Sequence, residues 1–160
     1  MGKKTVSKKT AIAEIVQSFR KIFKAIHRYS EEVLKAFGVT GPQLWLLKTL
    51  RDEGGTSVGE LSQKMYLHIS TVSGIIDRLE KKGSVARKRE APDRRVVTVH
   101  LTPAGKRIVD KAPEPFQGKL LYSLENLSKE EVSEMHQALQ KIVHLMELEQ
   151  IEATFFFGEE

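Results

Sequence analysis

Residues 68–102 read HISTVSGIIDRLEKKGSVARKREAPDRRVVTVHLT, and this stretch decides the fold. Its first half carries apolar residues at helical spacing, so that one side of a helix is apolar. These residues are Val72, Ile75, Ile76 and Leu79. Gly83 ends the helix, and residues 85–89 and 96–101 then read as two strands joined by a charged turn. The stretch therefore predicts a short amphipathic helix followed by a β-hairpin.

The opposite side of this helix is small, hydroxylated and basic. It presents Ser70, Thr71, Ser73, Gly74, Arg78 and Lys81. Small side chains let a helix lie close to base edges, hydroxyls bond phosphates or bases, and Arg pairs bidentately with guanine. Asp77 interrupts the pattern because a carboxylate repels phosphates. We expect it either to orient a neighbouring Arg or Lys or to accept from a cytosine amino group. For the helix on its own, an ordinary solvated face is the alternative.

The hairpin concentrates positive charge. Between Arg78 and Arg95 there are eight Lys or Arg residues and three acidic ones, a net charge of +5 that equals the formal charge of the whole chain. Arg94 and Arg95 lie in the turn, where arginine suits insertion into a minor groove, and Asp93 is placed to fix their rotamers. An isolated hairpin of this kind is typical of a charged solvent-exposed loop. Directly after a small-faced helix, it favours a winged helix-turn-helix that binds DNA.

The composition describes one domain of ordinary size: 160 residues, 40% hydrophobic and 29% charged. The absence of cysteine excludes disulfides, thiolate metal sites and thiol sensing, and it fits a reducing cytosol. No apolar run approaches the roughly 20 residues that span a bilayer. After Leu124 there are nine acidic and two basic residues, so the basic middle can face DNA while the acidic end faces away. The basic N-terminus is expected to be a disordered start or a weak phosphate-contacting arm.

The N-terminal segment predicts a long helix. From Thr10 to Phe37 apolar residues recur with helical period and form a broad stripe. A helix of roughly 40 Å, at 1.5 Å per residue, exceeds what one small domain can cover. Part of the stripe is therefore expected to pack on another subunit. The alternative is a monomer with two shorter helices broken near Tyr29 and Ser30.

Start and stop signals divide the rest of the chain into helices. Capping boxes are predicted at Thr40 with Gln43, at Ser57 with Glu60 and at Ser128 with Glu131. Thr102-Pro103 opens a further helix, which Pro113 and Pro115 interrupt. The final helix is expected to bury Val132, Met135, Leu139, Ile142, Val143 and Met146. The aromatic run 155–157 is expected either to contact a partner subunit or to fray.

Together these features resemble the MarR family of winged-helix transcription regulators. Residues 67–83, LHISTVSGIIDRLEKKG, are similar to the family's recognition helix. Asp93-Arg94-Arg95 with Leu101-Thr102-Pro103-Ala104-Gly105 resembles its wing signature, and Thr40-Gly41-Pro42-Gln43 the start of its second helix. The similarity is strong from about residue 40 to 107 and architectural elsewhere. Ser84 departs from the pattern, since the family usually has a larger apolar residue there, and this change is expected to loosen the wing base.

The resemblance implies a mainly α fold with a small antiparallel β-wing, flanked by N- and C-terminal dimerisation helices. Residues 1–160 would form a single domain, with the DNA-binding lobe at 38–107 and tails at 1–9 and 151–160. Residues 10–37 and 108–150 would form the helical dimerisation region. In the family these helices interlock two chains, and each protomer places one recognition helix in a major groove of a pseudo-palindromic site.

The function implied is that of a sequence-specific, double-stranded DNA-binding transcriptional regulator in the cytoplasm, a repressor by family habit and a homodimer. The residues expected to contact DNA are Ser70, Thr71, Ser73, Gly74, Arg78, Lys81, Arg87, Lys88, Arg89, Asp93, Arg94 and Arg95. Of these, Arg95 matches the family's minor-groove arginine and Asp93 its buttress. The alternative is an architectural DNA-binding protein with little sequence preference.

Many members of the family bind small phenolic or anionic effectors between the dimer helices and the lobe. The candidates to line such a pocket here are Arg20, His27, Arg28 and Tyr29, although ordinary surface positions are the favoured interpretation for most of them. No cofactor is expected, and no metal site either, because the histidines are scattered without a compact His, Asp or Glu set. An enzyme is not expected, because the sequence shows no Gly-rich phosphate loop and no nucleophile with a base at recognisable spacing.

The wing assignment leads to the first prediction. Arg95→Ala should weaken operator binding by about one to two orders of magnitude and flatten its salt dependence, because the arginine displaces counterions from phosphates. Titrating operator DNA at several salt concentrations measures both quantities. Unchanged affinity and unchanged slope would contradict the wing assignment.

Overall fold

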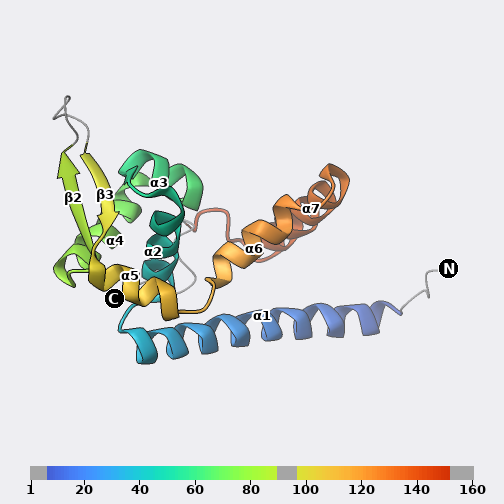
Figure 1. Ribbon diagram of the computed structural model, residues 1–160. Coiled ribbons are helices and arrows are strands. Elements are labelled where there is room, and N and C mark those ends of the chain that lie inside the picture. The colour runs from blue at the N-terminus through green and yellow to red at the C-terminus, as the bar shows by residue number, and fades with distance from the viewer. Residues whose placement is uncertain (1–6, 90–96, 152–160) are drawn as a thin grey trace.

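The computed structural model describes residues 7–89 and 97–151 (Figure 1). Its elements are α1 (Lys8–Phe37), α2 (Gly41–Glu53), β1 (Thr56–Ser57), α3 (Val58–Met65), α4 (Ile69–Lys81), β2 (Val85–Arg89), β3 (Val97–Leu101), α5 (Pro103–Lys111), α6 (Phe116–Glu125) and α7 (Lys129–Leu145). Helices α2 to α5 and the strands gather into a lobe, from which α1 and the pair α6 and α7 extend in the same direction. The predicted mainly α fold with a small antiparallel sheet is confirmed.

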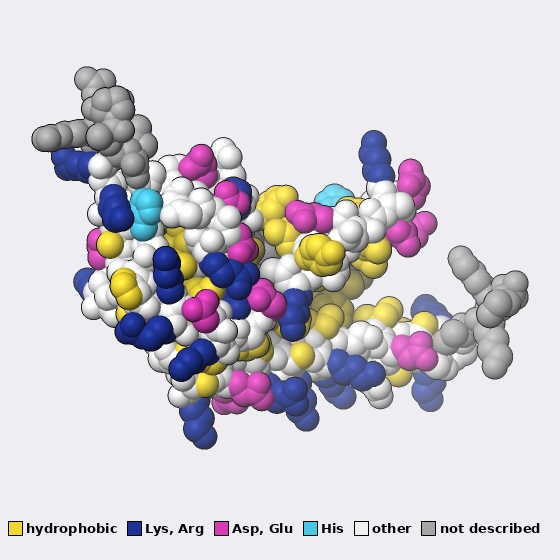
Figure 2. Space-filling model, in the orientation of Figure 1, with side chains coloured by type: hydrophobic (Ala, Val, Ile, Leu, Met, Phe, Trp, Pro, Cys, Tyr) yellow, Lys and Arg dark blue, Asp and Glu magenta, His cyan; other side chains and the backbone are white. Residues whose placement is uncertain are grey.

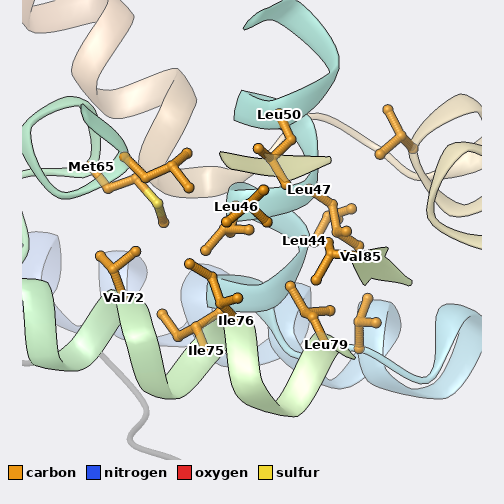
Figure 3. Close-up of a cluster of buried hydrophobic side chains, with 14 of the residues drawn as sticks. Leu44, Leu46, Leu47, Leu50, Met65, Val72, Ile75, Ile76, Leu79 and Val85 are labelled. Atoms are coloured by element: carbon orange, nitrogen blue, oxygen red, sulfur yellow. The ribbon is translucent and has the colours of Figure 1, made fainter. Parts of the chain in front are cut away.

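The lobe is built on an apolar core that α2 and α4 share (Figure 3). The side of α4 predicted to be apolar is buried, with Val72, Ile75, Ile76 and Leu79 between 0% and 3% exposed. Facing it are the buried leucines of α2, which are Leu44, Leu46, Leu47 and Leu50. Burial of one such side chain contributes about 1.5–3 kcal/mol, so this contact dominates the stability of the lobe.

The sheet continues this core. Its strand order is β1-β3-β2, and both pairs are antiparallel, with Val85 opposite Leu101 and Arg89 opposite Val97. Val85 and Val99 are buried against the helices, which attaches the base of the wing to the core. Strand β1 was not predicted from the sequence, because its two residues are too few to show any periodicity.

Helices α2, α3 and α7 begin where their capping residues predict. Helix α1 begins at Lys8, two residues before the predicted start at Thr10, because Ser7 caps it. The Thr40 side chain accepts from the N–H of Gln43, and the Gln43 side chain accepts from the N–H of Thr40. Reciprocal bonds of the same kind join Ser57 with Glu60 and Ser128 with Glu131. The three predicted capping boxes are confirmed, and each satisfies backbone N–H groups that the first helical turn leaves without intrahelical partners.

Helix α1 is continuous from Lys8 to Phe37, so the alternative with a break near Tyr29 and Ser30 is wrong. The left-handed backbone of Gly38, with φ of 68°, ends it. The predicted break at the prolines is confirmed, since α5 ends at Lys111 and α6 begins at Phe116. Among the described helices, none is both long enough and apolar enough to cross a membrane.

Much apolar surface remains uncovered outside the lobe. On α1 the exposed residues are Ile12, Ile15, Val16, Ile22, Phe23 and Leu34, and on α6 and α7 they include Leu120, Val132, Met135, Leu139 and Leu145. Figure 2 shows apolar side chains lining the space between α1 and the α6–α7 arm. The expectation that the last helix buries its apolar side is wrong for the single chain. Every residue from 128 to 141 is exposed, because no other element of the described chain packs over that side.

Gly105 permits a close approach that holds α5 against the base of the wing. A Cβ atom at this position would overlap the carbonyl oxygen of Ser84, which already accepts from the N–H of Thr102 at 3.1 Å. Ser84 itself is buried, so the small residue at this position fills a tight site. The predicted loosening of the wing base by Ser84 finds no support in this packing.

This close approach generates a prediction. Gly105→Ala should lower the free energy of unfolding by about 1 to 3 kcal/mol, because backbone atoms must shift to admit a methyl group. The matched control is Gly74→Ala on α4, where nothing lies within 4 Å of an added Cβ atom. There the same substitution should raise stability by up to about 1 kcal/mol through helix propensity. Urea titration of both variants provides the measurement, and equal stabilities would contradict the packing described.

Candidate DNA interface

The turn between α3 and α4 sets the direction of the recognition helix. Tyr66 ends α3 in the left-handed region, with φ of 52°, and its N–H donates to the carbonyl of Gln63. The Ser62 hydroxyl donates to the carbonyl of Leu67 at 2.6 Å, and the N–H of Leu67 donates back to the carbonyl of Ser62. These bonds fix the turn at both ends, so α4 leaves it at a defined angle.

The outward side of α4 carries the residues predicted to face DNA. Ser70, Arg78 and Lys81 are exposed, whereas Thr71, Ser73 and Gly74 are half-buried. The absence of any atom within 4 Å of an added Cβ at Gly74 leaves room for another surface to approach the helix backbone there. The structure thus places all six residues on the side of α4 away from the core.

The hairpin carries the other predicted contacts. Lys88 and Arg89 are exposed on β2, towards the end of the strand that leads into the turn. Asp93, Arg94 and Arg95 lie outside the described residues. The wing is therefore described at its base, where β2 and β3 pair over five residues each.

Arg87 differs from the other predicted contacts described on the wing because two carboxylates bind its guanidinium. Its guanidinium donates to Asp77 at 2.6 Å and to Glu80 at 2.5 Å, and its backbone N–H donates to Glu80 as well. The hydrogen bond to Asp77, followed by those to Glu80, raises the pKa of Arg87 above its ordinary value. Two carboxylates thus compensate one guanidinium, and the pair of contacts ties β2 to the recognition helix.

The ion pair with Arg87 also explains why a carboxylate, Asp77, lies on the outward side of α4. Of the two roles considered, the ion pair with a neighbouring arginine is the one present in the structure. Glu80, one turn further along α4, was missed as a partner of the wing. The available signal was the i, i+3 spacing of two acids beside a basic strand, but sequence spacing alone does not give the distance between a helix and a strand.

The four candidates for an effector site lie on α1 in different surroundings. Arg20 is exposed, while His27 pairs with Glu31 and Arg28 with Glu32 one turn along the same helix. Tyr29 instead packs on the core of the lobe, and its buried hydroxyl has no hydrogen-bond partner among the described residues. Burial, aided by the charge of Glu114, raises the pKa of Tyr29 to about 12. Only Tyr29 therefore points toward the junction between α1 and the lobe.

Lys48 was missed by the sequence reasoning because it falls on the apolar side of α2. Its side chain is 7% exposed, and its ammonium donates to the carbonyl of Ala112 at 2.9 Å and to Glu114 at 3.1 Å. It fastens α2 to the linker between α5 and α6. In the part of the chain that the structure describes, no group of three or more His, Asp or Glu side chains is arranged to hold a metal ion.

A recognition helix on a helix-turn-helix, joined to a basic β-hairpin, defines the chain as a winged helix-turn-helix DNA-binding protein. The model of the MarR family matches residues 39–97. The chain is 37% identical over 135 residues to the HTH-type transcriptional regulator YsmB of Bacillus subtilis (strain 168), covering 84% of this chain and 92% of that relative.

Solved structures give the same result. A MarR family protein from Bacillus stearothermophilus is 34% identical with a TM-score of 0.53, over 89% of this chain and 99% of that one. A MepR-like protein complexed with pseudoligands is 29% identical with a TM-score of 0.57, over 86% and 96%. The chain belongs to the MarR family of HTH-type transcriptional regulators, which bind DNA and are not enzymes.

Because two carboxylates bind Arg87, we predict that this residue positions the wing and does not contact a phosphate. Arg87→Ala should weaken operator binding about threefold to tenfold, the equivalent of roughly 1 kcal/mol, because the wing loses its attachment to α4. The salt dependence of binding should stay unchanged. Lys88→Ala, on the same strand, is the control and should lower the slope of log affinity against log salt by about 0.9.

Fluorescence anisotropy of operator DNA at several salt concentrations measures both variants. Asp77→Asn sharpens the comparison. It removes a negative charge from the DNA-facing side, and it should nevertheless weaken binding because Arg87 loses a partner. A loss of slope in Arg87→Ala equal to that in Lys88→Ala would show that Arg87 contacts phosphate directly.

Proposed function

We propose that the protein is a homodimeric repressor that binds a pseudo-palindromic operator in double-stranded DNA in the cytoplasm and is released by a small effector. Residues 38–107 form the DNA-binding lobe in this proposal, and residues 10–37 and 108–150 form the dimerisation region. The observation that carries it is the division of the surface: the lobe buries most of its apolar residues, while α1 and the α6–α7 arm leave many of theirs in contact with water.

The uncovered apolar side chains support a second copy of the chain as their partner. Contiguous exposed apolar surface on a soluble protein marks an interface. The residues concerned are far apart in sequence, yet they line the same space between α1 and the α6–α7 arm (Figure 2). An equivalent arm of a second chain has the matching apolar character, as a two-fold interface requires.

The dimer gives the two recognition helices a fixed separation. Each α4 would enter a major groove, and the wings would reach the flanking minor grooves. Two half-sites related by a dyad would then lie about 34–36 Å apart, or a multiple of this distance. Ser70, Thr71, Ser73, Gly74, Arg78 and Lys81 would face the groove from α4, and Lys88, Arg89, Arg94 and Arg95 would approach the backbone and minor groove from the wing.

An effector that acts on this dimer would bind where the lobe meets the long helices. A groove of about 550 Å³ lies between α2 and α6, with Trp45 and Tyr122 in its walls. The charged side chains that line it are three lysines and four acids: Lys48, Lys64, Lys119, Asp52, Glu53, Glu114 and Glu125. The aromatic walls suit a phenolic molecule, whose hydroxyl the charged groups can bind. Occupation of the groove would shift α6 relative to α2, and with it the distance between the two recognition helices. The MepR-like relative was solved in complex with pseudoligands, which supports small-molecule binding by this fold.

The experiment that tests the function is selection of bound duplexes from random sequence, followed by competition with bulk DNA. We expect a pseudo-palindrome that is preferred over bulk DNA by about three orders of magnitude or more. A ratio near one would instead support an architectural DNA-binding protein with little sequence preference.

The dimer carries its own prediction. Leu139→Glu places a charge on the apolar side of α7, where the leucine is 54% exposed in the single chain. Sedimentation should show a monomer, and affinity for the full palindrome should fall by at least about tenfold while a single half-site is bound as before. Gln137→Glu adds the same charge to the polar side of α7 and should leave the dimer intact. A wild-type protein that is monomeric at every concentration would refute the proposal.

A further inference from the structure

Two large apolar side chains of the lobe are exposed without an explanation from dimerisation. In the described part of the lobe, residues 38–89 and 97–107, Tyr66 is 74% exposed and Ile69 is 59% exposed. The other large hydrophobic residues with such exposure lie on α1, α6 and α7 or beyond them. Tyr66 and Ile69 instead flank the turn that leads into the recognition helix.

Their exposure is built into the backbone. Tyr66 has a positive φ, a conformation that costs energy for a bulky residue and persists only where its surroundings impose it. The hydrogen bonds of Ser62 and Gln63 hold the turn in this shape. Ile69 is the first residue of α4 and lies at the edge of the apolar side, next to the exposed Ser70. Both side chains are therefore held in the solvent at the leading end of α4.

The chemistry of this end of α4 is apolar and hydroxylated, not basic. Residues 69–76 include no Lys, Arg, Asp or Glu, and the first charged residue of the helix is Asp77, which pairs with Arg87. The N-terminal residues of a recognition helix are those that contact base edges. Without a cation there, bidentate recognition of guanine is excluded from the first two turns. An apolar side chain can still distinguish one base edge in the major groove, the C5-methyl group of thymine.

We infer that Ile69, assisted by Tyr66, is a specificity-determining residue that contacts the thymine methyl group in each operator half-site. This inference rests on the proposed function, since it requires α4 to enter the major groove of a specific site. It explains why a helix whose core side is fully apolar also carries an isoleucine toward solvent. It also specifies the sequence read by this end of the helix: a thymine, with the hydroxyls of Ser70 and Thr71 beside it.

Replacement of thymine by deoxyuridine tests the contact, because it removes only the methyl group from the DNA. Using the duplex that wild-type protein selects from random sequence, each thymine of a half-site is replaced in turn. Loss of one buried methyl contact should weaken wild-type binding roughly fourfold at one position. Ile69→Ala should bind the thymine duplex correspondingly less tightly, and its affinity should not change further with deoxyuridine. Tyr66→Ala should make the loss of affinity on deoxyuridine substitution smaller than the fourfold loss of wild type.

The controls separate this contact from other causes. Lys88→Ala should weaken binding to all duplexes and keep the full fourfold deoxyuridine effect, since its contact is with the backbone. Circular dichroism and thermal unfolding of Ile69→Ala should match wild type, because alanine suits the first turn of a helix. Wild-type protein that ignores deoxyuridine at every position, or Ile69→Ala that retains the full effect, overturns the inference while the regulator function stands. If no preferred duplex is selected, both the proposed function and this inference fail.

Discussion

The contact between the leucines of α2 and the apolar side of α4 is the constraint on which the rest of the structure depends. It buries the inner side of the recognition helix so completely that only the outer side can interact with anything else. Because Val85 and Val99 join the same core, the wing base has a fixed position relative to that helix. The recognition helix and the wing base are thus parts of one rigid unit, as recognition of a duplex would require.

Charge in this unit has two different uses. Lys81, Lys88 and Arg89 extend into solvent and can displace counterions from phosphates. Arg87 is held between Asp77 and Glu80, so its charge joins the wing to α4. The count of eight Lys and Arg residues in this segment therefore overstates the number of cations available to DNA. Asp77 and Glu80 therefore contribute to the interface, because they hold the Arg87 guanidinium in one position and keep it from binding other groups.

The lobe and the long helices differ in how completely their side chains are packed. Within the lobe, Lys48 and Gly105 make close contacts that leave little freedom between neighbouring elements. In α1, α6 and α7, many apolar side chains remain exposed. The two regions are joined by the turn at Gly38, by Val33 and Tyr29 of α1, which pack on the lobe core, and by the linker that Lys48 and Glu114 hold. In the proposed dimer, a change at this junction would alter the separation of the two lobes.

The sequence by itself determined the order of the helices, the starting points of α2, α3, α5 and α7, the buried side of α4 and the family. These features depend on local signals: capping boxes, helical periodicity and a contiguous motif. Tertiary structure alone decided the partners of Arg87, the burial of Lys48 and the exposure of Tyr66 and Ile69. Each of these depends on which elements meet in space, and an isoleucine at the edge of an apolar side has the same sequence pattern whether it is covered or not. For the same reason the apolar side of α7 was expected to be buried, although nothing in residues 7–89 and 97–151 covers it.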